Sequence, residues 1–290
     1  MVPVAVGLVL YLVTGTRLPW VSYSEGLPAG GELRVVFIDV GQGDSALICT
    51  DSFSVLIDSG EQDKYTQVSR CLESCGIERR DFIITSHPHS DHIGAVAEII
   101  KNYEVGELIV PVLDESMIPM SSSCDEMLVQ AERKNIPVTE VTSGKKITSD
   151  GCTLDFLAPV REYDDLNDSS LVVKLTYGSV SFLFTGDIEQ DAENDMVSSG
   201  ADLNADILKV PHHGSGTSST RDFIMAVRPQ YAVFSAGGEN GYGHPHANIV
   251  QRYRSYGAEM LRTDISGNIT FTTNGTDITY TTEHRLIEAA

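Results

Sequence analysis

The stretch DFIITSHPHSDHIG, residues 81–94, places three imidazoles and one carboxylate within six positions, directly after an apolar run. The apolar run predicts a short buried strand, so the polar side chains come at the rim of a sheet. His87 and His89 are two residues apart and face the same way in extended chain. Asp91 and His92 are adjacent and diverge where the chain turns into a helix.

Two directions of projection indicate two ions, one held by His87 and His89 and the other by Asp91 and His92. Neutral imidazole and carboxylate are the ligand mixture that zinc or another borderline divalent metal prefers. The alternative is a polar, solvated turn. Partly desolvating these groups without a metal would cost several kcal/mol, and nothing nearby in the sequence offsets that cost.

The composition is that of a folded protein with a strongly acidic surface. The chain has 290 residues, is 41% hydrophobic, and carries 20 basic and 41 acidic side chains, which gives a net charge of −21. It can bury a full core as one large domain or two small ones. The charge disfavours a general nucleic-acid binder, but a two-metal centre adds about +4 locally, so a nuclease remains compatible.

The five cysteines are scattered and far from the histidines. We interpret them as structural, and a cysteine zinc site is disfavoured because no second pair follows at ligand spacing. Cys71 and Cys75 are four apart, which on a helix places them on one face. A disulfide or a packed thiol pair is expected there.

The first 16 residues, 1–16, carry no charged side chain and are mostly apolar. The segment is short for a membrane-spanning helix, which needs about 20 apolar residues, and it lacks the basic start of a signal peptide. We interpret it as the end of a transmembrane helix or a short anchor, with a buried core helix as the alternative. Residues 17–31, rich in Pro and Gly, are expected to be a linker, and residues 32–290 a hydrolase domain.

Hydrophobic patterning predicts strands first and then alternating helices and strands, with the whole order occurring twice. This is typical of an α/β (α+β) protein with a two-sheet core and helices outside. The pair Asn274-Gly275 predicts a two-residue hairpin. The expected strands are 33–40, 45–49, 53–58, 81–85, 107–110, 138–141, 152–157, 171–177, 179–185, 206–210, 230–235, 259–263, 268–272 and 278–281. The expected helices are 64–75, one after Gly94, one starting near Ser122 or Ser123, 189–198, 218–227, and one ending near Tyr256.

Two further strands end in a carboxylate, at Asp58-Ser59-Gly60 and at Thr185-Gly186-Asp187. If two sheets face each other, these ends converge on the histidine cluster. A carboxylate between two cations can bridge them with its two oxygens, and we assign this role to Asp187 as a hypothesis. The alternative is that Asp187 caps the helix that follows it. Asp58 is expected to contact the ligands from outside, or to act as one.

Histidines also follow later strands, at His212-His213 and at His244-Pro245-His246. Adjacent residues in extended chain point in opposite directions, so one of His212 and His213 is expected to bind metal and the other to stand beside it as a proton donor. We assign His212 to the metal, and His213, His244 and Asp91 to catalysis.

His246 and His284 are assigned more distant roles. A glycine-rich loop, 237–243, could fold His244 and His246 over the site, and we place His246 with the residues around the ligands. Exposed loop histidines are as often inert, which is the alternative for both. His284, near the C-terminus, is expected at the surface.

Two divalent ions lower the pKa of a shared water towards about 7 and polarise a carbonyl or phosphoryl oxygen, which indicates hydrolysis. The metal centre alone does not distinguish an amide, a thioester and a phosphodiester. Lys209 and Arg221 are the nearest basic candidates for phosphate contacts, with an exposed, solubilising role as the alternative for either.

The HxHxDH pattern at 87–92 and the carboxylates at Asp58 and Asp187 resemble the metallo-β-lactamase superfamily, a four-layer αββα sandwich. Five further motifs resemble one branch of it, the C-terminal domain of ComEC-type DNA internalisation (competence) proteins, and the likeness covers residues 32 to about 281. These motifs are FIDVGQGDS (37–45), NDSSL (167–171), TGDI (185–188), LKVPHHGS (208–215) and YGHPH (242–246).

The resemblance implies a hydrolase with two divalent ions, Zn or Mn, that cleaves DNA. It further implies an exported, membrane-associated domain on the extracellular side, following a membrane channel region, where one strand is degraded while the other is imported. Two features depart from the pattern. Position 89 is His where many members carry HxDxDH, and the usual histidine before the bridging Asp is missing, the nearest residue being Asp168. Asp168 is therefore a candidate ligand or neighbour of the ligands.

Two alternatives stay open beside a DNA phosphodiesterase. One is a stand-alone exported metallo-hydrolase acting on a β-lactam, a thioester or a small phosphodiester. The other is a non-catalytic domain of a DNA-uptake channel, which the net charge of −21 favours.

Overall fold

The computed structural model describes residues 30–76, 79–119 and 121–284. The predicted apolar segment 1–16 and most of the predicted linker lie outside this part of the chain. Within the described residues, no helix combines the length and the apolar character needed to cross a membrane.

The first sheet has eight strands in the order β15-β14-β1-β2-β3-β4-β5-β6. Strands β14, β15, β1, β2 and β3 pair antiparallel, and β3 to β6 pair parallel. The strands are β1 (Leu33–Phe37), β2 (Ala46–Cys49), β3 (Ser54–Ile57), β4 (Arg79–Ile84), β5 (Glu104–Pro111), β6 (Val138–Val141), β14 (Ile269–Thr273) and β15 (Ile278–Thr282).

The second sheet has seven strands in the order β13-β12-β11-β10-β9-β8-β7. Strands β10 to β13 pair parallel, and β7 to β10 pair antiparallel. The strands are β7 (Lys146–Ser149), β8 (Cys152–Ala158), β9 (Val172–Tyr177), β10 (Val180–Phe184), β11 (Ile207–Lys209), β12 (Tyr231–Phe234) and β13 (Glu259–Arg262).

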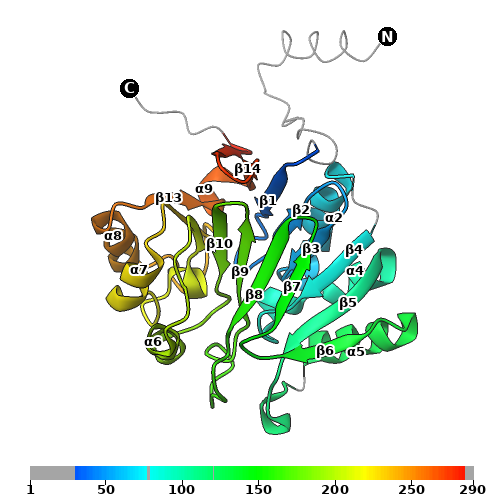
Figure 1. The fold of residues 1–290 in the computed structure, drawn as a ribbon. Coiled ribbons are helices and arrows are strands. Elements are labelled where there is room, and N and C mark those ends of the chain that lie inside the picture. Colours follow the sequence, from blue (N-terminus) through cyan, green and yellow to red (C-terminus); the bar gives the residue numbers. More distant parts are fainter. Residues whose placement is uncertain (1–29, 77–78, 120, 285–290) are drawn as a thin grey trace, which may run out of the picture.

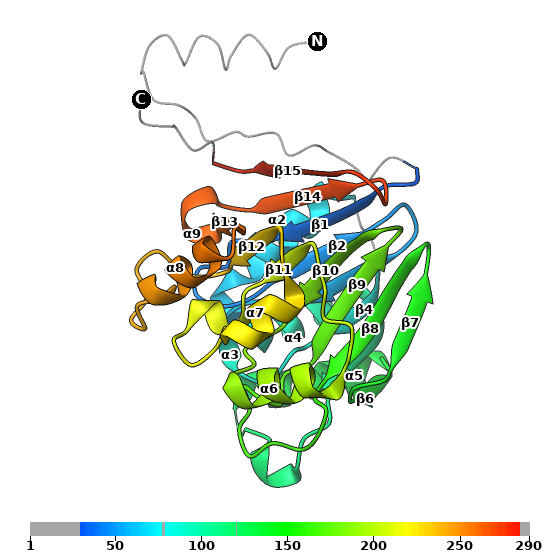
Figure 2. The ribbon, with the colours of Figure 1, turned by 60° about the vertical axis from the view of Figure 1, so that its left-hand side comes forward.

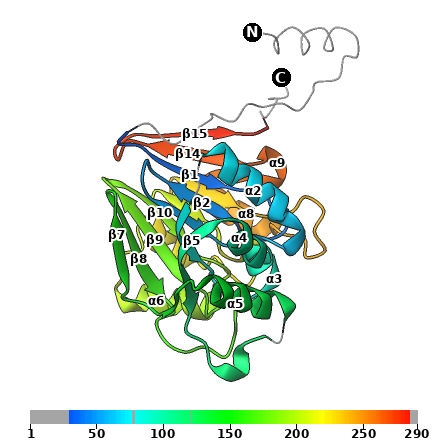
Figure 3. The same ribbon diagram turned by 90° about the vertical axis from the view of Figure 1, so that its right-hand side faces the viewer.

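Helices cover the outer face of each sheet, so the predicted four-layer αββα sandwich is confirmed (Figure 1). Figure 2 shows the face of the second sheet covered by α6 (Gln190–Ser199), α7 (Arg221–Val227) and α8 (Ala247–Ser255). Figure 3 shows the opposite side, with α2 (Tyr65–Ser74), α3 (Ser90–Ile93), α4 (Val96–Asn102) and α5 (Ser122–Lys134) over the first sheet. The short elements are η1 (Gln62–Lys64), η2 (Glu115–Met117), η3 (Pro211–Gly214) and α9 (Thr263–Ser266).

Three apolar layers separate these four layers, as the alternation of side chains along the strands requires. In β1, Leu33, Val35 and Phe37 face the layer between the sheets, and Val36 faces the helices. Aromatic rings fill the middle layer, where Phe271 contacts Phe37 and Phe182 edge-on with ring centres 6.0 Å apart. Strands buried on both faces therefore hold the sandwich together.

Two local details differ from the sequence-based prediction, and the start of α5 agrees with it. The β14–β15 connection has four residues, 274–277, rather than two, because Asn274 Oδ1 accepts hydrogen bonds from the backbone N–H groups of Thr276 and Asp277. Helix α5 begins at Ser122, as predicted, and is capped by Ser121, whose hydroxyl accepts a hydrogen bond from the N–H of Cys124. The half-exposed edge strand β7 was not predicted.

The β1–β2 loop packs directly against the segment that carries the histidine cluster. The N–H of Asp44 donates to the carbonyl oxygen of Asp91 at 3.1 Å. Gly43 beside it has φ +129°, and a Cβ at this position would lie 2.2 Å from that same oxygen. Only glycine permits this approach, so the loop fixes the position of Asp91.

We expect Gly43→Ala to lower the free energy of unfolding by about 1–3 kcal/mol more than a matched control, because its Cβ overlaps backbone. The control is Gly257→Ala, which has φ +83° but no atom within 4 Å of the added Cβ. Urea unfolding of both variants measures the difference. Equal losses of stability in the two variants would contradict the packing argument.

Candidate metal centre

Seven of the eight histidines in the chain gather at one place. Their rings form a continuous series in which each lies within 4.2–6.0 Å of the next, centre to centre: His89, His87, His92, His213, His212, His244 and His246. The eighth, His284, is exposed, as predicted. Residues 87–92, which follow β4, thus lie close to residues 212–213 and 244–246, more than a hundred positions further along the chain.

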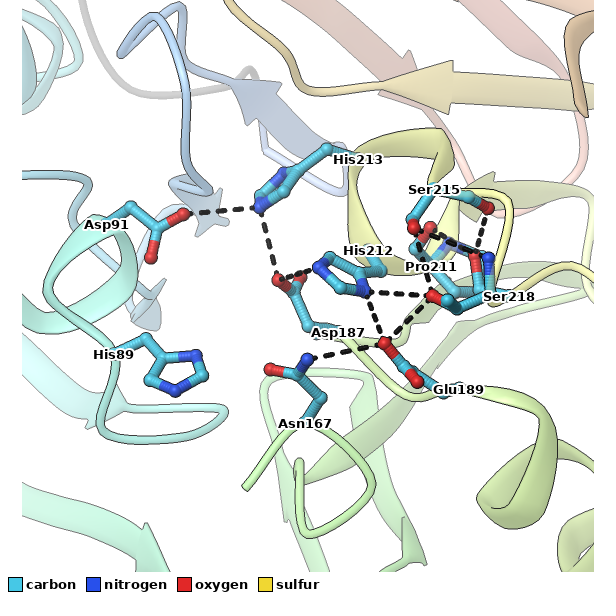
Figure 4. A network of polar contacts seen from close by, with 12 residues as sticks. His89, Asp91, Asn167, Asp187, Glu189, Pro211, His212, His213, Ser215 and Ser218 are labelled. Atoms are coloured by element: carbon cyan, nitrogen blue, oxygen red, sulfur yellow. Dashed lines mark hydrogen bonds and ion pairs between the residues drawn. The ribbon is translucent and has the colours of Figure 1, made fainter. Parts of the chain in front are cut away.

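Strand ends of both sheets bring these side chains together (Figure 4). His87 and His89 follow β4 of the first sheet, and Asp91 and His92 lie on α3. Asp187 follows β10 and His213 follows β11, both of the second sheet. In Figure 4, His89 and Asp91 face Asp187 and His213 from the opposite side.

Asp187 lies at the centre of the cluster. Its Oδ2 is 3.3 Å from His92 Nε2 and 3.2 Å from His213 Nε2. Asp91 Oδ2 approaches the same His213 Nε2 at 3.4 Å. Asp187 and both imidazoles are almost fully buried. One carboxylate therefore joins a histidine from each half of the sandwich.

His92 is held in place from behind by Asp58. The Nδ1–H of His92 donates to Asp58 Oδ2 at 2.9 Å. The same carboxylate accepts hydrogen bonds from the backbone N–H and the hydroxyl of Ser86, both at 2.7 Å. Asp58 thus contacts a ligand-type side chain and leaves His92 Nε2 facing Asp187, as outer carboxylates do in metal sites.

His213 is held in a similar way by Asp44 and a backbone carbonyl. Its Nδ1–H donates to the carbonyl oxygen of Ser235 at 2.9 Å and lies 3.3 Å from Asp44 Oδ1. The buried ammonium group of Lys209 pairs with the other oxygen of Asp44 and donates to the carbonyl of Gly186 at 3.1 Å. Sequence reasoning did not select Asp44, although the motif that contains it was noted.

The backbone at His212 and His213 is left-handed, with φ +47° and +53°. Two successive non-glycine residues in this region are strained, and such strain is retained where it serves a site. The pair therefore does not follow the extended geometry used to assign its roles. His213 points into the buried cluster, and His212 lies nearer its edge with a side chain that is 20% exposed.

The buried charges shift the pKa values of the central groups. Burial disfavours the charged form of both His92 and His213, but Asp187 and the other carboxylates nearby outweigh it and raise the pKa of each well above its usual value. Burial would raise the pKa of Asp187, but His213 and His92 hold it well below its usual range. His92 and His213 therefore favour the protonated form beside the ionised carboxylate of Asp187.

His87 and His89 form a second pair of nitrogens. His87 Nε2 and His89 Nδ1 are 2.9 Å apart. Burial, and then the neighbouring His92, lower the pKa of His87 well below its usual value. The ring of His87 is therefore neutral at pH 7, which is the state that binds a metal.

The donor set fits a divalent metal. Among the described residues, His92 Nε2, His213 Nε2 and Asp187 Oδ1 are buried and make no hydrogen bond, a costly state that a cation would relieve. Ligand-type atoms lie within 4.8 Å of one another in several groups. These groups are His87, His92 and Asp187; Asp91, His92 and His213; Asp44, Asp58 and His92; and Asp44, Asp187 and His213.

The later histidines divide into a cleft-facing pair and an anchor. His212 Nδ1 lies 3.0 Å from Glu189 Oε1, and its Nε2 is 3.8 Å from Asp187 Oδ2. His244 is half-buried with its Nδ1 unbonded, and burial followed by the neighbouring histidines lowers its pKa to about 4. His246 Nδ1 instead accepts a hydrogen bond from the N–H of Gly216 at 2.8 Å and so fixes the loop after His213.

Asp168 and Asn167 occupy different environments. Asp168 Oδ1 accepts hydrogen bonds from the N–H groups of Glu189 and Ala192, so it caps the start of α6. This is the capping role considered for Asp187. Asn167 instead lines the cleft, with Nδ2 donating to Glu189 at 3.4 Å and a buried Oδ1 that bonds to none of the described residues. Sequence reasoning missed Asn167 because an acidic neighbour seemed the better ligand.

Other predicted residues lie away from the cleft. Lys209 is 3% exposed and lies behind the cluster, so the exposed, solubilising role considered for it is wrong. Arg221 is exposed at the start of α7. Cys71 and Cys75 are free, buried thiols, and no cysteine belongs to a possible metal group of the described chain.

The cluster opens into a cleft of about 320 Å³. Two acidic side chains, Asp91 and Asp187, lie in its wall, and none of the described lining residues is Lys or Arg. The lining residues are Gln42, His89, Ser90, Asp91, Asn167, Asp187, His212, His213, Tyr242 and His244.

The family profile of the metallo-beta-lactamase superfamily matches residues 38–238. The chain belongs to this superfamily. The match includes β2 to β12 and therefore every ligand-type residue from Asp58 to His213. Membership agrees with the αββα architecture and with a metal-dependent hydrolase.

The curated relatives include a protein named for competence. The chain is 31% identical over 260 residues to the ComE operon protein 3 of Bacillus subtilis, covering 83% of this chain and 33% of that protein. It is 32% identical over 280 residues to the competence protein ComA of Neisseria gonorrhoeae, covering 92% and 38%. The chain thus spans about a third of the length of these relatives.

Solved structures support the fold. YhfI of Bacillus subtilis, a metallo-beta-lactamase fold protein, superposes with a TM-score of 0.56 at 14% identity, covering 83% of this chain and all of that one. Igni18, a metallo hydrolase of Ignicoccus hospitalis, gives a TM-score of 0.53 at 15% identity and covers 83% and 98%.

We expect the affinity for a divalent metal to rise with pH between about 6 and 8. The raised pKa values of His92 and His213 mean that both carry a proton in this range without metal, and coordination requires the neutral ring. Metal uptake therefore releases protons, and raising the pH favours it. Calorimetric titration with Mn²⁺ or Zn²⁺ in two buffers of different ionisation enthalpy measures the protons released; their absence at pH 6.5 would contradict this electrostatic account.

Proposed function

We propose that the protein is a two-metal phosphodiesterase that cleaves DNA during uptake at the cell surface. The observation that carries the proposal is the group of buried, unbonded Nε2 and carboxylate atoms around Asp187. The superfamily membership supports hydrolysis, and the names of the curated relatives support a role in competence. The membrane-associated, extracellular setting and a channel partner belong to the same proposal.

Four residues would hold one ion: Asp91, His92, Asp187 and His213. His87 and His89 would hold the second, with Asp187 between the two. When bound, a pair of divalent ions polarises a phosphoryl oxygen and lowers the pKa of a water molecule. Imidazole and carboxylate ligands serve Zn and Mn alike.

The geometry favours the opposite roles for the adjacent histidines from those assigned on the sequence. His213 is buried, is anchored through Nδ1, and presents Nε2 to Asp187 and Asp91, which suits a ligand. His212 lines the cleft and lies beside Glu189, a carboxylate that orients the ring. We propose His212 as the group that gives a proton to the leaving oxygen.

Two other side chains act on the substrate in this proposal. His244 is neutral at pH 7 and presents an unbonded Nδ1 beside the cleft. It would bind and orient the substrate through a hydrogen bond. The unbonded atom of Asn167 is the acceptor Oδ1, which would receive a hydrogen bond from a donor group of the substrate. Since none of the described lining residues is Lys or Arg, phosphate binding would depend on the ions and on the ring N–H of His244.

The proposal predicts metal-dependent cleavage of single-stranded DNA that is reduced at least about 100-fold in His87→Ala and Asp187→Ala, because each change removes a ligand-type atom that no neighbour replaces. Cleavage of a labelled oligonucleotide with Mn²⁺ or Zn²⁺ measures this, beside a chromogenic β-lactam. His284→Ala, an exposed histidine outside the cluster, is the control.

Cleavage of DNA that persists in both His87→Ala and Asp187→Ala would contradict the proposal. Hydrolysis of the lactam without hydrolysis of DNA would favour the alternative substrate class. A wild-type protein that takes up no divalent ion would instead favour a non-catalytic domain.

A further inference from the structure

The mouth of the cleft carries one large exposed aromatic side chain. Tyr242 lines the cleft together with His244 and is 70% exposed, the highest value among the large exposed hydrophobic side chains of the described residues. A tyrosine ring left in water has a cost, because the apolar part of its surface could be buried elsewhere. Its position beside the proposed metal centre places the exposed ring where a bound substrate would contact it.

One face of the Tyr242 ring is already supported. The ring stacks on His244 with 19° between the planes and 5.6 Å between the centres. The ring of His244 in turn lies 5.5 Å from His212 and 6.1 Å from His213. The tyrosine is therefore the outer member of a series of rings that leads from the solvent to the residues proposed to bind metal.

One side chain, Asn240, makes four hydrogen bonds within the loop that carries Tyr242. Asn240 Oδ1 accepts hydrogen bonds from the N–H groups of Tyr242 at 3.2 Å and His244 at 2.9 Å. Its Nδ2 donates to the carbonyl oxygens of Gly237 and His244, both at 2.6 Å. Four hydrogen bonds to one amide fix the turn, so the ring is presented in a defined place.

The charge around the cleft leaves stacking as the available source of affinity for a strand beyond the metal ions and the neutral side chains of the cleft. The protein has a net charge of −21, and no Lys or Arg side chain lines the described cleft. Proteins that bind single strands combine a basic groove with aromatic platforms on which bases stack. None of the described residues that line this cleft is basic, but an aromatic platform is present in Tyr242.

We propose that Tyr242, backed by His244, is a nucleobase-stacking subsite that holds one unpaired base of a single-stranded DNA next to the metal centre. The inference rests on the proposed function and adds the form of the substrate to it. A base within a duplex is stacked on its neighbours and cannot reach a ring at the side of the cleft. The subsite thus selects single strands or frayed ends.

Tyr242→Ala tests the subsite in the metal-loaded protein. We expect KM for a short oligothymidylate to rise about 5- to 150-fold with kcat nearly unchanged, since stacking on an aromatic side chain contributes about 1–3 kcal/mol per base. Tyr242→Phe keeps the ring and should stay within about twofold of wild type. Tyr256→Ala, which removes a tyrosine that is 43% exposed outside the cleft, is the matched control.

A second experiment identifies the base that is stacked. Oligothymidylates with one abasic position, moved along the strand, are compared for wild type and Tyr242→Ala. In the wild type one abasic position should reproduce the loss seen with Tyr242→Ala, and in the variant that position should cause no further loss. Additive losses at every position, or an unchanged KM in Tyr242→Ala, would overturn the proposal.

Binding of a hydrolysis-resistant phosphorothioate oligonucleotide, followed by fluorescence anisotropy, separates this inference from the proposed function. If wild type binds the strand through Tyr242 but cleaves no DNA, the nuclease proposal fails and the subsite stands. If wild type cleaves DNA while Tyr242→Ala binds and cleaves equally well, the subsite fails and the nuclease proposal stands. A wild-type protein that binds no single strand would reject the subsite.

Discussion

The structure depends on one buried carboxylate, Asp187, placed between imidazoles from two different sheets. His92 reaches it from the first sheet and His213 from the second, at 3.3 and 3.2 Å. Removing three such groups from water is costly unless each finds a partner. The two halves of the sandwich are thus arranged so that an ion between them would satisfy atoms that the protein leaves unbonded.

Outer carboxylates make this arrangement rigid. Asp58 fixes His92 and Asp44 fixes His213, each through Nδ1, so both rings present Nε2 inward. Lys209 offsets part of the negative charge by pairing with Asp44 from behind. The glycine at position 43 lets the loop carrying Asp44 approach the backbone of Asp91. Residues from separate sequence motifs therefore orient the side chains that would bind metal.

The local sequence pattern was enough to predict the four layers and the clustering of the histidines with Asp187, because apolar strands that end in ligand-type residues mark one edge of a sheet. It did not suffice for roles that depend on backbone conformation. The alternation rule applied to His212 and His213 assumes extended chain, whereas both are left-handed. Asp168 caps a helix that the sequence does not place against it, and its neighbour Asn167 faces the cleft instead. Such contacts are long-range and have no local signal.

The described residues that line the cleft include two carboxylates and no Lys or Arg. An acidic protein with such a cleft can bind a phosphodiester there only if metal ions supply the positive charge. Anomalous scattering from crystals soaked in Mn²⁺ or Zn²⁺ tests this most directly. The account predicts one ion bound by Asp91, His92, Asp187 and His213, and a second bound by His87 and His89. An absence of anomalous density among these residues, with the crystals intact and the metal in excess, would contradict it.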